Sequence, residues 1–181
     1  MCDFYNNLSE HEKEVYNNYK RNINRYAYKL NTALRLNKFS EFETDVNLLD
    51  GIVDSNRTEN AIKLYRAAYD SIVLDFIDED QYSNPEFLST SKDAESIQKH
   101  FTEYDPIYII INCPSGAAMV SMESNEMSSG LEFEILLGRN NVFDIIENRF
   151  ITERKQLDFI MGKDKSEGVS RLRLLRLNLR V

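Results

Sequence analysis

The sequence is poor in the residues that cross-link chains or bind metal ions. Its 181 residues include two cysteines, Cys2 and Cys113, and two histidines, His11 and His100. Two cysteines, one of them at the first few positions, cannot build a disulfide framework. Two histidines far apart in the chain give no ligand cluster for structural or catalytic zinc. We therefore expect a reduced or redox-indifferent protein whose chemistry uses no metal.

Long apolar runs are missing as well. No stretch approaches the roughly 20 apolar residues of a membrane-spanning helix, and residues 1–7 lack the apolar segment of a signal peptide. The net charge of -8 argues against a nucleic-acid backbone as the main partner. These absences predict a soluble protein that acts in the cytoplasm and does not insert into membranes. A toxin domain delivered into a host or competitor cell by another chain would look the same.

The composition and the order of patterns predict one α+β domain. A hydrophobic content of 42%, with 11% aromatic residues, is typical of a globular protein. The length fits a single domain with a sizeable core. Helical patterns come first and strand patterns follow, which is the arrangement of the α+β class. We expect a single domain over residues 1–181, with a helical lead-in at 1–50 and a β-rich core at 60–181.

The first third of the chain has helical periodicity. Ser9 and Glu12 form the capping-box pattern Ser-x-x-Glu, which marks a helix start. Apolar residues then recur every three or four positions from Val15 to Leu30, which predicts one long amphipathic helix or two helices broken near Asn24. A polar connection at 39–46 leads to a short helix around residues 48–53.

The remainder alternates short apolar runs with turn residues. Strands are expected at 64–66, 87–91, 108–111, 132–137, 142–146 and 171–181, with 61–77 as an alternative helix, and a short strand or turn is expected at 117–120. We expect loops at 78–80 and 83–85, a helix at 93–100, and a hairpin formed by 149–152 and 157–161. The Leu174-Leu175 pair interrupts the alternation of the last strand and predicts a β-bulge.

A Glu-x-Glu pattern stands at the start of one of these strands. Glu132 and Glu134 follow the polar, Gly-containing loop 124–130, and strand alternation puts both side chains on one face. Like charges about 7 Å apart repel each other, so such a pair needs either abundant water or a function. The plain structural alternative is the solvated face of an edge strand.

Three short motifs in one order resemble a known family. They are Tyr65-Arg66 on an early strand, Ser89-Thr90-Ser91 at a strand end, and the Glu132-x-Glu134 pattern. Together they resemble the arginine-serine-glutamate class of mono-ADP-ribosyltransferases, which includes the enzymatic components of clostridial binary toxins. The resemblance covers nearly the whole chain. It implies N-terminal helices packed on a two-sheet, mostly antiparallel β core, with NAD as a substrate and no metal.

The resemblance also implies roles for the motif residues. Glu134 would bind the ribose of NAD and stabilise the cationic sugar, and Ser89 would hold Glu134 in place. Arg66 would bind the NAD phosphates. Glu132 would orient an arginine of a target protein and take its proton. The expected NAD-binding set is completed by Thr90, Ser91 and Phe101, where Phe101 either packs on nicotinamide or belongs to the core.

Several features depart from the family pattern and keep alternatives open. Ala67 stands where the family usually has glycine, the interval between Arg66 and Ser89 is short, and Glu103 and Tyr104 occupy positions where an arginine is expected. The alternatives are an NAD glycohydrolase, a non-catalytic binding module of the same fold, and an unrelated α+β protein.

Partners are predicted by the same resemblance. The loop 124–130, with Glu126 and Met127, would contact the protein substrate, which presents its arginine side chain. A delivery or inhibitor partner remains open.

Overall fold

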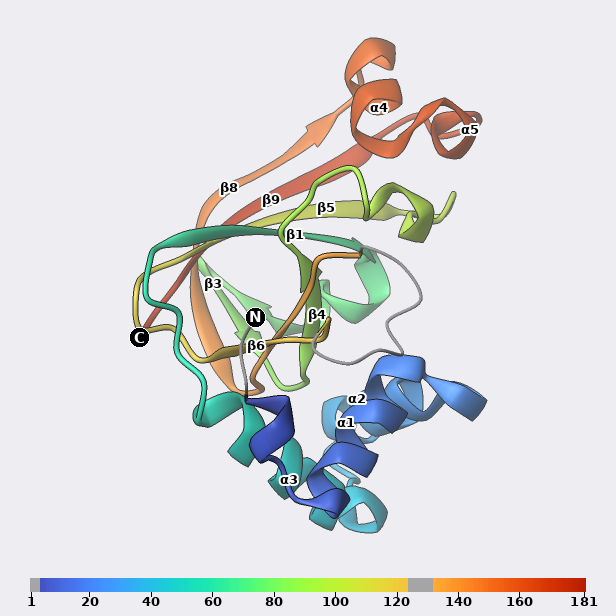
Figure 1. Ribbon diagram of the computed structural model, residues 1–181. Helices are drawn as coiled ribbons and strands as arrows, with labels where there is room; N and C mark the ends of the chain where they lie inside the picture. The colour runs from blue at the N-terminus through green and yellow to red at the C-terminus, as the bar shows by residue number, and fades with distance from the viewer. Residues whose placement is uncertain (1–3, 124–131) are drawn as a thin grey trace.

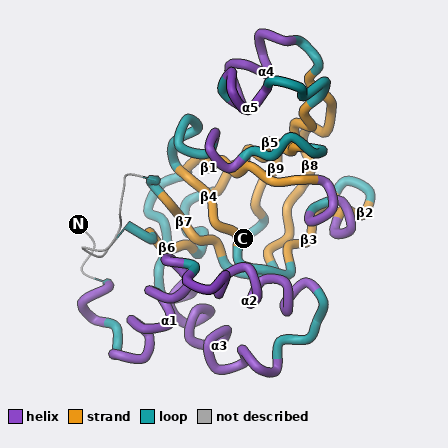
Figure 2. Tube along the Cα trace, turned by 90° about the vertical axis from the view of Figure 1, so that its right-hand side faces the viewer, coloured by secondary structure: helices purple, strands orange, loops and turns teal. Residues whose placement is uncertain are grey.

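The computed structural model describes residues 4–123 and 132–181, in which helices flank a large curled sheet (Figure 1). The helices are α1 (Glu10–Arg21), α2 (Tyr26–Arg35), α3 (Glu43–Asp54), α4 (Arg154–Met161) and α5 (Lys163–Ser166). The strands are β1 (Ile62–Tyr69), β2 (Ile77–Asp78), β3 (Gln81–Asn84), β4 (Leu88–Ser91), β5 (Pro106–Cys113), β6 (Met119–Ser121), β7 (Glu134–Leu137), β8 (Asn141–Ile151) and β9 (Leu172–Leu179). Helices α1–α3 gather on one side of the sheet, and α4 and α5 lie at the opposite end (Figure 2). None of the helices in the described ranges is both long enough and apolar enough to span a membrane.

The α+β class is confirmed, but the strands form one sheet where two were expected. Their order is β2-β3-β8-β9-β5-β1-β4-β7-β6, and every neighbouring pair is antiparallel except β5 and β9. Strand β1 pairs with β5 along its whole length but with β4 at one register position, Tyr65 opposite Ser91. The sheet bends sharply there, and β4 crosses β1 in Figure 1. One continuous sheet can therefore present two faces toward each other.

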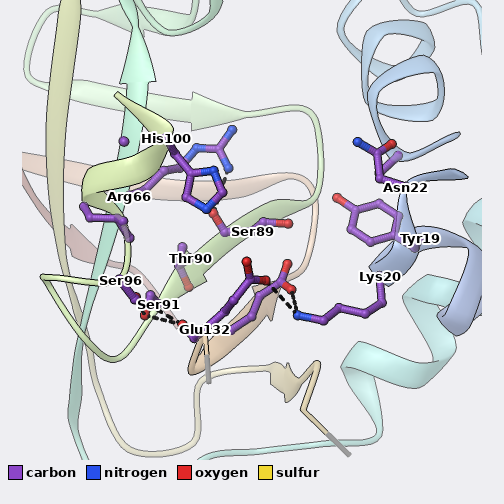
Figure 3. Close-up of a pocket in the computed structure, with 14 residues that line it drawn as sticks. Tyr19, Lys20, Asn22, Arg66, Ser89, Thr90, Ser91, Ser96, His100 and Glu132 are labelled. Carbon is purple, nitrogen blue, oxygen red and sulfur yellow. Dashed lines mark hydrogen bonds and ion pairs between the residues drawn. The ribbon is translucent and has the colours of Figure 1, made fainter. Parts of the chain in front are cut away.

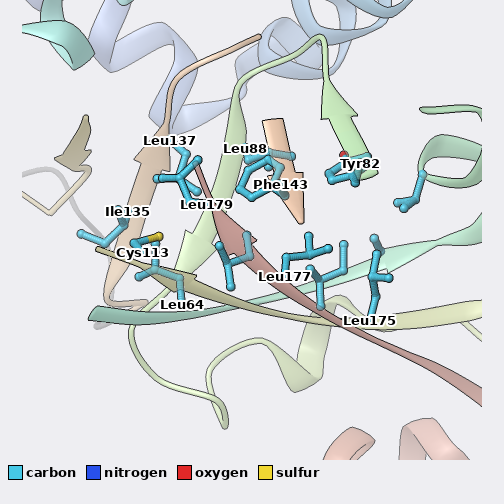
Figure 4. Close-up of a cluster of buried hydrophobic side chains, with 14 of the residues drawn as sticks. Leu64, Tyr82, Leu88, Cys113, Ile135, Leu137, Phe143, Leu175, Leu177 and Leu179 are labelled. Carbon is cyan, nitrogen blue, oxygen red and sulfur yellow. The ribbon is translucent and has the colours of Figure 1, made fainter. Parts of the chain in front are cut away.

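Three apolar clusters hold this arrangement together. The largest joins strands from both halves of the curled sheet and includes Leu64, Leu137 and Leu177, all fully buried (Figure 4). A second cluster packs the helices α1–α3 against Phe87 and Leu136. A third lies between β5, β9 and α4. The second cluster fixes the distance between the helices and the sheet, which sets the width of the space between them.

The helical lead-in follows the sequence pattern and breaks where the two-helix alternative expected it. Ser9 and Glu12 form the capping box that starts α1. After Arg21 the backbone is left-handed at Asn22, Asn24 and Arg25, with φ of 48°, 53° and 61°. Residues other than glycine adopt this conformation at a cost, so the long periodic stretch divides into α1 and α2. Helix α3 begins at Glu43, earlier than expected.

Most strand predictions are confirmed, and several strands are longer than expected. The stretch 64–66 belongs to β1 and is a strand, so the helical alternative for 61–77 is wrong. The loops expected at 78–80 and 83–85 are wrong in part, because β2 and β3 occupy much of this stretch and β3 pairs with β8.

The helix expected at 93–100 is wrong, since only Gln98–His100 forms a 3₁₀ turn. The side chain of Asp93 accepts a hydrogen bond from the Ser96 amide at 2.8 Å, and the Ser91 hydroxyl accepts one from the Asp93 amide at 2.9 Å. Such side-chain bonds to the backbone compete with helix formation.

The hairpin expected at 149–161 is also wrong. Strand β8 continues to Ile151, and the following residues form α4. Leu157 and Met161 are both buried and stand four positions apart, which is helical spacing.

The β-bulge lies on a different strand from the one expected. Leu174 and Leu175 are both buried because β9 is covered on both faces, Leu174 by the cluster near α4 and Leu175 by the main core. The register between β5 and β9 is continuous. The register shift is instead in β8, between Ile145 and Glu147.

We expect the substitution Leu177→Ala to destabilise the protein by about 2–5 kcal/mol, because it leaves a cavity in the main core. The matched control is Leu36→Ala, whose side chain is 61% exposed and whose loss should cost under about 0.5 kcal/mol. Urea unfolding of both variants measures the difference. Equal losses for the two leucines would contradict the described core.

Candidate active site

A pocket of about 370 Å³ opens between α1 and the bend of the sheet (Figure 3). Six residues singled out in the sequence line it together: Arg66, Ser89, Thr90, Ser91, Glu132 and Glu134. They come from β1, β4 and the start of β7, which are neighbouring strands. The opposite wall is formed by α1 and the turn after it, through Tyr19, Lys20 and Asn22. Motifs that are far apart in the sequence thus share one cavity.

The Glu-x-Glu segment is irregular. A strand from Glu132 was expected, but β7 begins at Glu134, and Phe133 has a left-handed φ of 50°. Phe133 is 43% exposed, while Ile135 is buried. Both glutamates nevertheless face the same partner, Lys20. The expectation that the two carboxylates share one face is therefore met, although a local turn as well as strand alternation produces it.

The Ser-Thr-Ser motif holds the backbone of this segment. The Thr90 hydroxyl donates to the Ile135 carbonyl oxygen at 2.7 Å, and the Ser91 hydroxyl donates to the Glu132 carbonyl oxygen at 2.7 Å. Ser96 also donates to the Glu132 carbonyl oxygen, at 3.2 Å. Two of the three motif residues therefore fix the backbone from which the glutamate side chains extend.

Ser89 makes a different contact from the one expected. Its carbonyl oxygen accepts a hydrogen bond from Arg66 Nη1 at 2.8 Å. The carboxylate of Glu134 is held by Lys20, with Nζ 2.5 Å from Oε2, and among the described residues Ser89 does not bond it. Ser89 thus connects the pocket to Arg66, and the support of Glu134 comes from helix α1.

Lys20 is a residue of this site that the sequence analysis missed. Its Nζ lies 2.5 Å from Glu134 Oε2, 3.1 Å from Glu132 Oε2 and 3.3 Å from Glu123 Oε1. Oxygen atoms of the three carboxylates lie within 4.8 Å of one another, a spacing that suits a cation, and the ammonium group bonds all three. Burial acts to lower the pKa of Lys20, but the bonds and charges of Glu134, Glu132 and Glu123 raise it above its ordinary value.

The other carboxylate oxygen of Glu132, Oε1, contacts a second lysine. Lys99 bonds Glu132 Oε1, and its side chain is 56% exposed. The hydrogen bond from Lys99, aided by Lys20 and opposed by burial, lowers the pKa of Glu132 to about 2. Glu132 is therefore a carboxylate throughout the neutral range, with a cation on each of its two oxygens.

Arg66 is held in place by a buried carboxylate. Glu86 is 2% exposed and lies 3.6 Å from Arg66 Nη2, and its other oxygen bonds Arg35 of α2. Burial raises the pKa of Glu86, although both arginines act in the opposite direction. Sequence spacing gives no indication of this trio, because Glu86 lies between two strands and resembles an ordinary loop residue.

Of the neighbouring residues His100 and Phe101, it is His100 whose ring lines the pocket. Phe101 is 2% exposed and packs edge-on against Tyr108, with ring centroids 6.2 Å apart, so it belongs to the core, as one of the two sequence interpretations held. His100 lines the pocket and points toward it in Figure 3. Burial and the nearby Lys99 lower the pKa of His100, which leaves its ring neutral at neutral pH.

A second pocket of about 360 Å³ adjoins the first and shares Arg66, Ser89 and His100 with it. It extends toward Arg35, Glu86 and Tyr28. The two together form a groove with carboxylates at one end and guanidinium groups at the other. The loop 124–130, expected to contact a protein substrate, lies outside the described residues.

No family model and no curated protein matches this sequence. Solved structures of similar fold include Plx2a, an ADP-ribosyltransferase toxin from Paenibacillus larvae, with a TM-score of 0.72 and 16% identity, covering 98% of this chain and 90% of that chain. C3stau2 from S. aureus, solved with NAD, has a TM-score of 0.69 and 17% identity, covering 96% of this chain and 88% of that one.

A further similar structure is BECa, an ADP-ribosylating toxin of a binary enterotoxin of C. perfringens, solved with NADH. Its TM-score is 0.73 at 12% identity, and the match covers 98% of this chain and 45% of BECa. This chain thus spans less than half the length of BECa. The chain has the fold of ADP-ribosyltransferase toxins.

The substitution Arg35→Met should destabilise the protein by about 3–5 kcal/mol at neutral pH, because it removes one of two cations from a buried carboxylate. The folded-state pKa of Glu86 is already raised and would rise further. The penalty is therefore present above that pKa and is relieved as the pH falls below it. Urea unfolding at about pH 7 and about pH 5 should show the loss shrinking at the lower pH.

The control for this experiment is Arg176→Met, whose side chain is 51% exposed and pairs with Glu147 at 2.9 Å. An exposed pair contributes little, so this variant should stay close to wild type at both pH values. A loss in Arg35→Met that did not change with pH would mean that Glu86 does not carry the effect.

Proposed function

We propose that this chain is an NAD-dependent mono-ADP-ribosyltransferase that modifies arginine on a target protein and releases nicotinamide. The observation that carries the proposal is the meeting of Arg66, Glu132 and Glu134 in one pocket. The fold supports it, because Plx2a is an ADP-ribosyltransferase toxin, BECa is an ADP-ribosylating toxin solved with NADH, and C3stau2 was solved with NAD.

The groove offers complementary ends for a dinucleotide. Arg66 presents a planar set of donors that suits a pyrophosphate, and its orientation is fixed by Ser89 and Glu86. The glutamate end suits a ribose, whose hydroxyls donate hydrogen bonds to carboxylates. NAD would lie with its phosphates near Arg66 and its nicotinamide ribose near Glu134, with the His100 ring beside it.

The reaction breaks the bond between ribose C1′ and the nicotinamide nitrogen. Nicotinamide leaves with the bonding electron pair, so positive charge develops on the ribose in the transition state. An ionised carboxylate beside the sugar stabilises that charge, and Glu134 would do this while bonding the 2′-hydroxyl. A nitrogen of the target arginine then bonds to C1′.

The arginine nitrogen needs help because a guanidinium group has a pKa above about 12 and does not attack unaided. Glu132 would bind the guanidinium and accept the proton released as the new bond forms. Its pKa of about 2, lowered mainly by the bond from Lys99, keeps it charged for binding the guanidinium. An incoming guanidinium would displace Lys99, whose side chain is 56% exposed, from Glu132 Oε1.

An NAD glycohydrolase is the second candidate. Both oxygens of Glu132 already bond lysines, so a target arginine must displace Lys99 to reach Glu132. Water can accept the ADP-ribosyl group without displacing Lys99. The same pocket would then cleave NAD without modifying a protein.

We expect Glu134→Gln to lower nicotinamide release from NAD by about 10²–10³-fold, because a neutral amide stabilises the ribose cation poorly. Glu132→Gln should retain nicotinamide release but lose transfer of the ADP-ribosyl group to arginine. The measurement uses labelled NAD with polyarginine or a host-cell lysate as acceptor, and hydroxylamine to release label from arginine.

The control is Glu10→Gln on α1, since the Glu10 side chain is 93% exposed and does not line the pocket. It should match wild type in both assays. Nicotinamide release without labelled protein, equal in wild type and Glu132→Gln, would favour the glycohydrolase. Absence of both release and NAD binding would refute the enzymatic proposal.

A further inference from the structure

Lys20 is the cation at the centre of the carboxylate cluster, and it comes from outside the sheet. It lies in the last turn of α1, and its side chain is 8% exposed. Its ammonium group bonds the carboxylates of Glu123, Glu132 and Glu134 at once, and these three partners are all anions. Glu123 adds a second contact, because its Oε1 accepts the Glu134 amide at 3.2 Å.

The cluster would not keep its charges without this ammonium group. Carboxylates this close repel one another, and in such a group one pKa rises until a proton is taken up. A protonated Glu134 could not stabilise a ribose cation, and a protonated Glu132 could not bind a guanidinium. A buried cation that bonds all three removes this difficulty.

The position of Lys20 is fixed by two tyrosines that precede it in the helix, Tyr16 and Tyr19. The Tyr16 hydroxyl donates to the Ser121 carbonyl oxygen at 2.7 Å. The Tyr19 ring packs on Phe87, and its hydroxyl accepts a hydrogen bond from Asn31 at 3.0 Å. Both tyrosines are buried. The ammonium group therefore extends from a rigid base, unlike that of Lys99.

We propose that Lys20 is a positioning residue, which holds the carboxylates of Glu132 and Glu134 side by side and charged in the pocket. The effect of Lys20 on catalysis, unlike its effect on the charge of the glutamates, rests on the proposed function. Lys20 bonds Oε2 of Glu134, and no described residue bonds Oε1, which leaves that oxygen open to a ribose hydroxyl. The lysine thus orients Glu134 without covering both of its oxygens.

The other charged and titratable groups around the cluster come from two more elements, the 3₁₀ turn Gln98–His100 and β1. Lys99 bonds Glu132 from the 3₁₀ turn. Burial and Lys99 lower the pKa of His100 in the same turn, Glu132 and Glu134 oppose this, and Arg66 of β1 adds to it. Among the described residues, Lys99 is the cation besides Lys20 that directly contacts Glu132 or Glu134. A test of Lys20 must therefore separate its effect from that of Lys99.

The first experiment measures nicotinamide release against pH for wild type, Lys20→Met and Lys20→Arg. In Lys20→Met we expect kcat to fall about tenfold or more, with a smaller change in KM for NAD. The fall in activity on the acid side of the pH profile (the acid limb) should move up by about one pH unit. Lys20→Arg should keep the wild-type acid limb, since it retains the charge. The matched control Lys13→Met removes a lysine of the same helix that pairs with exposed Glu10, and it should match wild type.

A Lys20→Met enzyme with wild-type kcat and an unmoved acid limb would overturn the proposal. A faster enzyme would also overturn it and would mean that Lys20 blocks the pocket.

The second experiment needs neither activity nor a folded Lys20 variant. Glutamate labelled with ¹³C at the carboxyl carbon reports each ionisation by NMR, and the Glu132 signal is assigned by its loss in Glu132→Gln. In Lys99→Met, Glu132 should still titrate well below the ordinary value of about 4.3, because Lys20 remains. An ordinary value there would overturn the proposal, even if the protein proved not to cleave NAD. Conversely, a low value in a protein that never releases nicotinamide would leave the role of Lys20 standing and refute only the enzyme.

Discussion

Besides apolar packing, an ion pair links each of the three N-terminal helices to a strand or to a loop beside a strand. Helix α1 is tied through Lys20 to Glu134, α2 through Arg35 to Glu86, and α3 through Asp50 to Arg139 at 2.8 Å. Apolar packing alone is tolerant of sliding, whereas a charged pair with little solvent exposure has a strict geometry. The same contacts that fix the helices also orient the two glutamates and Arg66. Stability and chemistry in this region therefore depend on the same few side chains.

The sequence was informative wherever a local pattern decides the structure. A capping box, an alternating run or a hydroxyl-rich strand end depends on neighbours in the chain, and these patterns placed α1, β4 and β5 correctly. The motifs at Arg66, Ser89 and Glu134 could be ordered along the chain, and they meet because their strands are neighbours in the sheet. The failures at 93–100 and 149–161 are also local, since side-chain bonds and helical spacing decided against the expected elements.

Ion pairs between residues far apart in the chain could not be predicted from the sequence. Lys20 and Glu134 are 114 positions apart, and Arg35 and Glu86 are 51 positions apart. Each of these residues has an ordinary local reading, as a charged helix position or a loop residue. Which of His100 and Phe101 faces the pocket likewise depends on the direction of one 3₁₀ turn. The partners of charged side chains follow from topology, which no spacing rule along the chain encodes.

The place of β9 in the sheet has a consequence for how the chain folds as it is synthesised. β9 follows the other eight described strands in the chain, yet it stands between β8 and β5. Among the described strands it alone joins the group β2-β3-β8 to the group β5-β1-β4-β7-β6. Until residues 172–179 leave the ribosome, the two groups have no shared edge, and both edges are open to wrong pairing. Closure then needs contacts of high sequence separation, which form slowly. Nascent chains of this fold thus pass through an interval in which strand edges are exposed. During this interval a chaperone that covers those edges would have its largest effect.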